Sequence, residues 1–418
     1  MTQPPASASG KRGLAPRPVI VIAIITGVCL LGDSSLYALL PSRLEAFSVT
    51  PTGAGLILGI NRYIRILSNS GAGWVVQRVG VPWPLAFAVV LASATTFAYG
   101  AASGFWMLFV AHALWGIAWS FLRLGGYLAA AETGPAGSVG RHMGALQSLS
   151  RAGSLVAVVV GGLLADIIGV RDTLLLFGAL TLGALALVPM AQIPAGLGKA
   201  KPRRAPLAQA VTEPGVASNR ASDRALVWRI RSLYAQAAIT WMLVAGLFMG
   251  TAGYMVRTVT GDGTTIAGVA IGVGTLSGIV LGIRWVADLG LSPLFGHLSD
   301  RLGRPRIILT AMAAAAAAML TVAINPTLAV AIPMYAIIFA GGTALTVSLN
   351  ASVAEMAPVD RRAIVLSRYA TWADIGSGSG ASIGLPLVAG TGFGLAYGLG
   401  AALITLAGLT YWAVFVRR

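Results

Sequence analysis

Long apolar segments, separated by short charged or Gly/Pro-rich breaks, make up most of this chain. A helix that crosses a bilayer needs about 20 mostly apolar residues. Segments such as Thr173–Met190 are apolar on every face, whereas the strands of a membrane β-barrel alternate apolar and polar residues. The pattern predicts an all-α integral membrane protein with twelve transmembrane helices, at about Pro18 to Leu40, Thr52 to Val75, Trp83 to Gly100, Phe105 to Ala130, His142 to Ile167, Thr173 to Ile193, Tyr234 to Arg257, Ile266 to Phe295, Ile307 to Ile324, Leu328 to Ser348, Ala363 to Val388 and Phe393 to Val416.

The composition supports this prediction and excludes a soluble domain. Hydrophobic residues make up 56% of the chain, charged residues only 10%, and the mean hydropathy is +0.81, all far from the values of soluble proteins. Basic residues before the first apolar segment imitate a secretory leader, but that segment is too long for one and no small-residue cleavage pattern follows. We therefore expect a retained first helix, in which the single cysteine, Cys29, is a packing residue.

The basic residues are distributed unevenly along the predicted topology. If the N-terminus is cytoplasmic, twenty of the 29 Lys and Arg residues lie on the cytoplasmic side, and only Arg43, Arg171 and Arg257 lie on the other. This asymmetry is the positive-inside rule. It predicts a multi-pass protein of the cytoplasmic (inner) membrane with both termini in the cytoplasm, and it explains the net charge of +16 without a nucleic-acid partner.

The chain divides into two related halves. The predicted parts are a cytoplasmic tail (1–17), a six-helix bundle (18–193), a basic cytoplasmic linker (194–233) and a second six-helix bundle (234–416). The sequence from Gly59 to Gly80 aligns without a gap with that from Gly282 to Gly303, 223 residues later. Two pseudo-symmetric halves around a central site are the arrangement of alternating-access transporters.

A charged stretch in the second half carries a family resemblance. The sequence "GHLSDRLGRPR" resembles the loop after the second helix of each half in the major facilitator superfamily, where the pattern is G-x-x-x-D-R-x-G-R-[RK]. The first-half copy, "GWVVQRVGVPW", has Gln77 in place of the aspartate. We call the matching residues the gating motif: Gly73, Arg78 and Gly80 in the first half, and Gly296, Asp300, Arg301, Gly303 and Arg304 in the second.

The resemblance covers the whole chain and implies the fold of this superfamily, with helix contacts at the motif that break when the two halves rock. Because Gln77 carries no charge, we expect the first-half contacts to be weaker. The alternative is that the motif is an ordinary solvated turn.

Two further helices match the family only in part. In the fourth helix His112 stands where the family often has arginine, and Gly116 matches. The fifth helix keeps Gly161 and Gly162 but lacks the proline found in many antiporters, which leaves antiport undecided.

Nine ionisable residues lie inside the apolar segments, where each costs ~3 kcal/mol at the bilayer centre. Arg284 and Asp288 are four residues apart and can pair on one helix face. Arg123, Arg151 and Arg368 are placed where long side chains can extend to the cytoplasmic surface. The remaining four are Asp33, Arg62, Arg65 and Asp374, the last of which can cap or pair locally.

Asp33 is the strongest candidate for proton coupling because it lies near the middle of the first helix, which lines the central cavity in the family that the chain resembles. Burial of a carboxylate favours its protonated form, as suits a group that binds a proton on one side and releases it on the other. The competing interpretation is a permanent ion pair with Arg62 or Arg65. His112, a titratable imidazole, and Asp374 are the other proton-coupling candidates.

Two arginines indicate the substrate. In the repeat alignment Arg62 corresponds to position 285, next to Arg284, so two related helices each carry an arginine at nearly the same depth. Guanidinium groups suit bidentate binding of carboxylate or phosphate oxygens. The candidate substrate-binding residues are Arg62, Arg65, Arg284, Tyr37 and Arg123. The alternative is that Asp288 and Asp33 neutralise the arginines and leave a cavity for neutral or lipophilic compounds, as in multidrug exporters.

We therefore predict a proton-coupled secondary transporter that moves a small molecule, with an organic anion favoured, across the bilayer by alternating access. It is expected to be a monomer, to use the proton gradient and to need no cofactor. No nucleotide-binding, metal-ligand or hydrolase pattern indicates an enzyme. The alternatives are a multidrug or sugar efflux proton antiporter and, in another class, a non-transporting membrane sensor or assembly factor, which would show no flux and no need for Asp33. A channel is disfavoured by the repeat.

Overall fold

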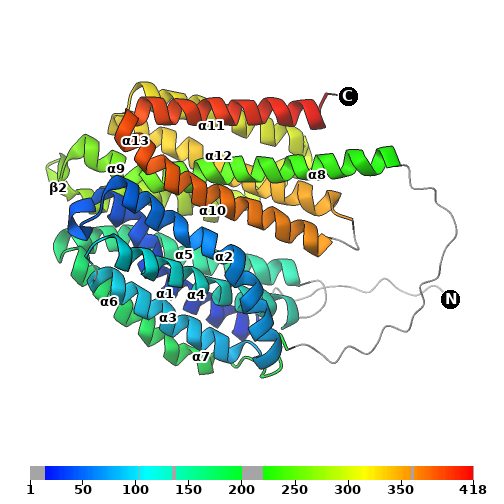
Figure 1. Ribbon diagram of the computed structural model, residues 1–418, viewed down its shortest axis with the longest axis horizontal. Coiled ribbons are helices and arrows are strands. Elements are labelled where there is room, and N and C mark those ends of the chain that lie inside the picture. Colours follow the sequence, from blue (N-terminus) through cyan, green and yellow to red (C-terminus); the bar gives the residue numbers. More distant parts are fainter. Residues whose placement is uncertain (1–14, 102, 134–137, 200–219, 359–361, 418) are drawn as a thin grey trace.

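The computed structural model describes residues 15–101, 103–133, 138–199, 220–358 and 362–417, which are almost entirely helical. Figure 1 shows the elements in chain order. The first half contains α1 (Arg17–Ser42), η1 (Leu44–Phe47), α2 (Pro51–Val79), α3 (Pro82–Ala101), α4 (Phe105–Glu132), α5 (Val139–Ile167), α6 (Val170–Gly183), η2 (Ala184–Ala186) and α7 (Leu187–Met190). The second contains α8 (Arg220–Trp241), η3 (Met242–Phe248), α9 (Met249–Thr260), β1 (Gly263–Ile266), β2 (Val269–Gly272), α10 (Val273–Leu302), α11 (Arg304–Ile324), α12 (Leu328–Met356) and α13 (Arg362–Phe415).

Every predicted transmembrane segment is largely helical, and ten helices of the described chain are long and apolar enough to cross a membrane. The difference from the twelve predicted spans has two causes. The helix α2 is not among the ten because Arg62 and Arg65 lie in its middle. The helix α13 passes through both of the last two predicted spans, with a non-helical residue, Gly392, between them.

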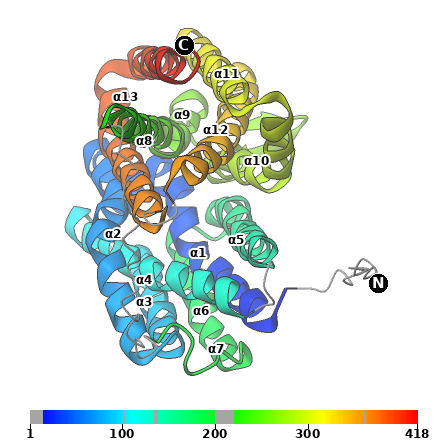
Figure 2. The ribbon, with the colours of Figure 1, turned by 90° about the vertical axis from the view of Figure 1, so that its right-hand side faces the viewer.

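The helices form two groups that meet along the length of the molecule. Figure 2 shows α1 to α7 in one group and α8 to α13 in the other. The groups contact each other where α2 packs against α13, α5 against α10, and α1 against α9. Both described chain ends lie at the same end of the helices (Figure 1), which we call the terminal end, and the other end is the far end. The predicted tail lies mostly outside the described residues, and α8 begins at Arg220, inside the predicted linker.

At the far end the two groups are in backbone contact. A Cβ atom added to Gly162 of α5 would lie 2.2 Å from the carbonyl oxygen of Gly274 of α10, and one added to Gly253 of α9 would lie 2.8 Å from that of Ala38 of α1. Small residues permit such close approach between membrane helices. The two halves are therefore packed tightly together at the far end.

One prediction about an element boundary is wrong. The eighth helix was expected to begin at Ile266, but α10 begins at Val273, and the preceding residues form the antiparallel hairpin β1–β2, with Gly263 paired to Gly272 and Ile266 paired to Val269. The two turn residues, Ala267 and Gly268, have φ values of 51° and 80°, as a tight two-residue hairpin requires. Alternating β-branched residues favour this strand conformation, although their hydropathy resembles that of a membrane helix.

Candidate functional site

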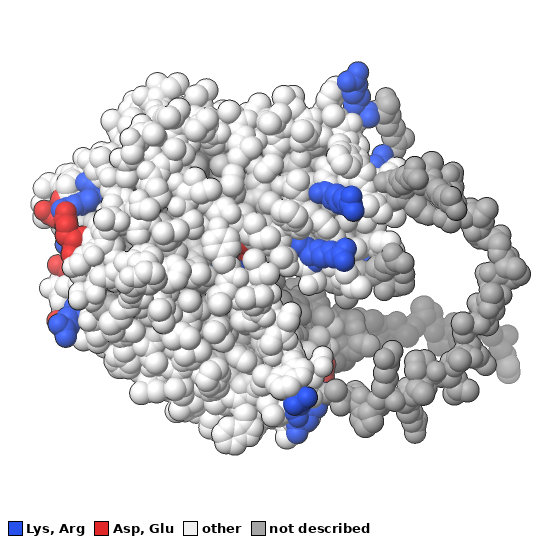
Figure 3. Space-filling view, in the orientation of Figure 1, with Lys and Arg blue, Asp and Glu red and all other residues white. Residues whose placement is uncertain are grey.

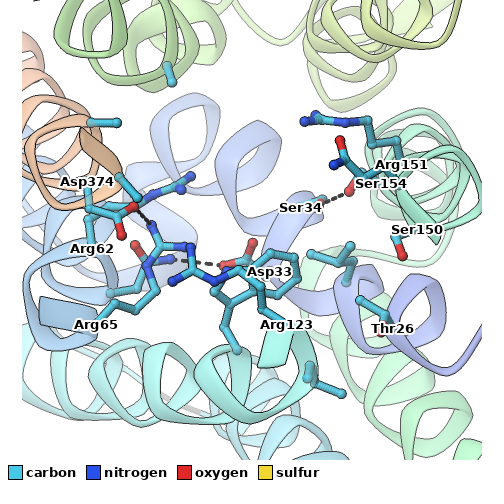
Figure 4. Close-up of a pocket in the computed structure, with 18 of the residues that line it drawn as sticks. Thr26, Asp33, Ser34, Arg62, Arg65, Arg123, Ser150, Arg151, Ser154 and Asp374 are labelled. Atoms are coloured by element: carbon cyan, nitrogen blue, oxygen red, sulfur yellow. Dashed lines mark hydrogen bonds and ion pairs between the residues drawn. The ribbon is translucent and has the colours of Figure 1, made fainter. Parts of the chain in front are cut away.

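A cavity of about 440 Å³ lies between the two halves. Helices of both halves line it: α1, α2, α4 and α5 on one side, and α8, α9, α10, α12 and α13 on the other. Ala245, in the π-helical segment η3, also faces it. Seven charged residues contribute to its surface, with five arginines against two aspartates: Arg62, Arg65, Arg123, Arg151, Arg284, Asp33 and Asp374. Figure 4 shows six of these, with Arg62, Arg65, Arg123 and Asp374 grouped on one side and Arg151 on the other.

Asp374 pairs with the other half of the protein. Its Oδ1 atom lies 2.7 Å from Nη2 of Arg65, so the ion pair joins α13 to α2. The expectation that Asp374 caps or pairs locally is wrong, because the closest cation comes from a helix more than 300 residues away in sequence. Both side chains line the cavity, so the pair crosses between the halves at the site itself.

Asp288 forms a second contact between the halves. The predicted pair with Arg284 is present, with Nη2 of Arg284 3.4 Å from Oδ2. Arg151 of α5 approaches the same oxygen more closely, at 2.6 Å, and the hydroxyl of Thr343 donates to Oδ1 at 2.6 Å. Arg151 therefore does not extend to the membrane surface as predicted, and Arg123 also lines the cavity. Asp288, whose side chain is 6% exposed, is neutralised in this way, as a buried carboxylate requires, whereas the side chain of Arg151 is 30% exposed.

Asp33 is buried at the cavity wall without the ion pair that the sequence allowed. Its Oδ1 atom accepts a hydrogen bond from Nδ2 of Asn61 at 3.3 Å and lies 3.8 Å from Nε2 of His112. Among the described residues, Asp33 forms no ion pair with Arg62 or Arg65. His112 is fully buried behind Asp33, outside the cavity lining, and its Nδ1 is hydrogen-bonded to the hydroxyl of Tyr99 at 2.9 Å.

The predicted substrate-binding residues Arg62, Arg65, Arg284, Tyr37 and Arg123 all line this one cavity. The guanidinium carbon of Arg62 lies 6.0 Å from the centre of the Tyr37 ring. Neither Arg62 nor Arg123 has an ion pair within the part of the chain that the structure describes. The arginines of the cavity lining thus carry positive charge that the carboxylates of the lining neutralise only in part.

Several buried hydrogen-bond donors of the cavity lining have no partner in the described structure. They are Nε of Arg62, Arg65 and Arg284, Nη1 of Arg284, and the indole N–H groups of Trp115, Trp119 and Trp285. Buried polar groups are normally hydrogen-bonded, and each exception needs an explanation. A ligand rich in acceptor atoms supplies one, because it would satisfy donors from both halves.

Sequence reasoning missed four tryptophans of the lining: Trp115, Trp119, Trp241 and Trp285. The position of a tryptophan along its span could have indicated them, because tryptophans of membrane proteins are enriched at the membrane–water interfaces. Trp115 and Trp119 instead fall in the middle of the predicted span from Phe105 to Ala130. Their position inside the span indicates that they face a polar or functional site within the protein.

The gating motif lies outside the cavity, at the terminal end. Gly80 and Gly303 have φ values of 86° and 88°, which glycine adopts without strain. Arg304 lies 3.6 Å from Asp300 and also bonds Glu355 of α12, so these contacts stay within the second half. In the first half, the guanidinium of Arg78 lies 3.8 Å from the ring centre of Trp74. For the remaining members, Gly73 and Gly296 lie within α2 and α10, and Arg301 is exposed.

We expect Arg304→Gln to slow transport more than Asp300→Asn. Arg304 pairs with residues of two helices, whereas Asp300 is exposed and, among the described residues, forms an ion pair with Arg304 alone. Exposed ion pairs contribute about 0–1 kcal/mol, so Asp300→Asn should change the rate by less than about fivefold. Gln77→Asp should be tolerated. Transport assays combined with cysteine accessibility from each side test this. A severe defect confined to Asp300→Asn would mean that the carboxylate acts through contacts of another conformation.

A further contact between the halves closes the far end. Asp166 of α5 accepts hydrogen bonds from the backbone N–H groups of Gly274 and Thr275, at 3.0 and 2.7 Å, and from the Thr275 hydroxyl at 2.7 Å. Arg43 binds the same carboxylate at 2.6 Å. A carboxylate at a helix N-terminus is stabilised by free N–H groups and the helix dipole. Asp166 thus caps α10 from the opposite half, a role that sequence reasoning did not identify.

Acidic and basic side chains lie together on the surface at the far end, on the left of Figure 3. Arg257 bonds both Asp262 and Glu45, which belong to different halves. The hydrogen bond and charge of Arg257 hold the pKa of the exposed Asp262 carboxyl below its usual range. Asp262 therefore remains ionised at neutral pH, and the far end keeps its mixed charges.

Two helical groups around a charged central cavity define a multi-pass membrane protein of the secondary transporter class. The sequence profile of the Major Facilitator Superfamily matches residues 22–290 and 275–418, and the chain belongs to this family. Its members with solved structures that resemble this chain are membrane transporters, and the prediction that the protein is not an enzyme is confirmed. No curated sequence shows significant similarity to the chain.

Solved structures of transporters share the fold. A point variant of the peptide transporter POT in complex with sulfate has a TM-score of 0.79 at 14% identity, covering 96% of this chain and 94% of that one. A point variant of the nucleoside transporter NupG has a TM-score of 0.73 at 13% identity, covering 96% of this chain and 99% of that one. A bacterial homologue of the human lysosomal transporter Spinster, in an inward-facing and unoccupied conformation, has a TM-score of 0.71 at 16% identity, covering 96% and 98%.

Proposed function

We propose that this protein is a proton-coupled secondary active transporter that moves an organic anion across the cytoplasmic membrane by alternating access, as a monomer and without a cofactor. The observation that carries the substrate class is the excess of five arginines over two aspartates in the cavity. Arg284 is 3% exposed and has two donor nitrogens without partners. Guanidinium groups with free donors suit carboxylate or phosphate oxygens.

The charge distribution also supports the proposed orientation. Arg301, Arg304, Arg306 and Arg417 lie at the terminal end, which the positive-inside rule assigns to the cytoplasm. The cavity lining includes Tyr127 and Leu366, close to the terminal-end limits of α4 and α13, whereas the far end is closed by backbone contacts. The described conformation is then the one that gives access from the cytoplasm.

Proton coupling is assigned to Asp33. A proton bound there removes one of the two negative charges of the lining and therefore strengthens the attraction of the arginines for an anion. Linkage is reciprocal, so a bound anion equally favours the protonated carboxyl. This coupling favours movement of proton and anion in the same direction. His112, 3.8 Å from Asp33 and bonded to Tyr99, is placed to orient the carboxylate.

The ion pairs between the halves give the substrate a role in the conformational change. Arg65 is held by Asp374, and Arg151 by Asp288. An anion that binds Arg65 competes with Asp374 and weakens the contact between α2 and α13. Because such a contact must break when the halves rock, we propose that binding of the anion lowers the barrier to that movement.

We expect Arg62→Gln and Arg284→Gln each to weaken anion binding by more than about tenfold, because a hydrogen bond to a charged group contributes about 1.5–3 kcal/mol. The assay is uptake into proteoliposomes under an imposed pH gradient, with organic anions, sugars and lipophilic cations as substrates. Arg171→Gln, at an exposed position outside both the cavity and the gating motif, is the matched control. Normal anion transport by both cavity variants would contradict the assignment, and transport of cations or neutral compounds alone would support the multidrug or sugar efflux alternative. Absence of any flux would favour the sensor alternative.

A further inference from the structure

The ten tryptophans of the chain fall into two groups. Six of them have exposed side chains: Trp74, Trp83, Trp106, Trp228, Trp372 and Trp412. Exposed tryptophans of a membrane protein contact lipid and the membrane–water interfaces, where this residue is enriched. The other four, Trp115, Trp119, Trp241 and Trp285, all line the central cavity. The interface preference does not explain this second group.

On one side of the cavity, α4 presents stacked rings. Trp115 and Trp119 are four residues apart, on the same helix face. Their ring centres lie 5.6 Å apart with an angle of 16° between the planes. His112 continues the stack behind Trp115, at 6.4 Å and 17°. The series of parallel rings holds the tryptophan planes in a fixed orientation at the cavity wall.

On the other side, the second half contributes Trp241 of α8 and Trp285 of α10. Each has an arginine near its ring, with Arg284 6.0 Å from the centre of Trp241 and Arg151 5.6 Å from that of Trp285. Arginine near an aromatic face is held by cation–π attraction. The wall of the second half therefore combines flat rings with guanidinium groups.

The indole nitrogens add a second observation that points to a ligand. The N–H groups of Trp115, Trp119 and Trp285 are buried and have no hydrogen-bond partner in the described structure. Buried tryptophan N–H groups usually find a partner. Packing alone would be served by phenylalanine or leucine, which bring no unpaired donor into the cavity.

We infer that the transported anion carries a flat aromatic or conjugated ring, as an arylcarboxylate does, whose acid group binds the cavity arginines while the ring packs against the tryptophans of both halves. This inference rests on the proposed anion transport and narrows its substrate class. Aromatic rings prefer offset-stacked or edge-to-face contacts with other rings, and such contacts add up to about tenfold in affinity beyond burial of area. A saturated ring of the same size lacks this gain.

Four probe compounds separate the contributions of ring and charge. They are 2-naphthoate, its saturated analogue decahydronaphthalene-2-carboxylate, and the uncharged carboxamides of both. Binding to the purified full-length protein is measured by isothermal titration calorimetry. We expect 2-naphthoate to bind up to about tenfold more tightly than the saturated acid, from the aromatic contacts, and each acid to bind more tightly than its amide.

Variants test the tryptophans directly. Trp119→Leu and Trp285→Leu should remove most of the preference for the aromatic acid while leaving the Kd of the saturated acid within about threefold, as an aromatic contribution predicts. Trp119→Phe and Trp285→Phe keep a ring and should retain the preference. Trp106→Leu, at an exposed position, is the control. Unchanged preference in both leucine variants would overturn the inference.

The outcomes for ring and charge are distinguishable. Equal binding of the two acids, both tighter than their amides, overturns the aromatic inference and leaves the proposed anion transport standing. Equal affinity for each acid and its amide would overturn the proposal that the substrate is an anion. The affinity for the aromatic amide would then be compared with that for the saturated amide, to decide whether the rings contribute on their own. Failure of all four compounds to bind overturns the inference.

Discussion

Replacing Asp33 with asparagine is expected to abolish accumulation driven by a pH gradient, down to the level of protein-free liposomes, while exchange of substrate between the two faces continues. Asparagine keeps the size of the side chain and its contact with Asn61 but cannot bind and release a proton. The two modes are compared in the same proteoliposomes, with gradient-driven uptake in one assay and counterflow of labelled substrate in the other.

Asp172→Asn is the matched control, because Asp172 is an exposed aspartate of the same half, in the first turn of α6. Gradient-driven transport at the original rate in Asp33→Asn would place the coupling proton elsewhere. His112 and Asp374 would then be tested in the same two assays. Loss of both uptake and counterflow would indicate that Asp33 is needed for folding or substrate binding, and the amount of folded protein separates those two cases.

Asp166→Ala is expected to open the far end. The substitution removes three hydrogen bonds to the start of α10 and the ion pair with Arg43. At about 1.5–3 kcal/mol for each hydrogen bond to a charged group, the loss amounts to several kcal/mol and favours the open state by at least about tenfold. Asp166→Asn keeps an acceptor oxygen and should have a smaller effect.

Thiol labelling measures this opening. A cysteine is placed at Ser382, where α13 contacts Gly59 of α2 between the cavity residue Asp374 and the far end, in a Cys29→Ser background. A membrane-impermeant reagent added on the far side should label it at least about tenfold faster in Asp166→Ala, following the shift in population. Asp172→Ala, an exposed position at the same end, should label at the parent rate. Equal labelling in the Asp166 variant would exclude a closing role for the cap.

The residues of the candidate site were predicted better than their partners. Asp33, Arg62, Arg65, Arg284 and Asp374 were singled out because an ionisable side chain in an apolar span needs a reason to be there, and all five line the cavity. Pairing was predicted correctly only for Arg284 and Asp288, which share a helix turn. The longer-range pairs depend on which helices are neighbours, and the spacing of residues in one segment carries no information about that.

The sequence by itself determined the class of fold and the chemical types of group inside it. Long apolar segments have few ways to satisfy their backbone in a bilayer, and helices are one of them, so the elements followed from local hydropathy. Only the tertiary structure decided that Asp374 meets Arg65, that Arg151 turns inward to Asp288, and that Asp166 caps α10. It also gathered four tryptophans from three helices into one cavity. The reason is that hydropathy reports whether a residue is buried, whereas the partner of a buried charge or ring is set by the packing of helices that are distant in the chain.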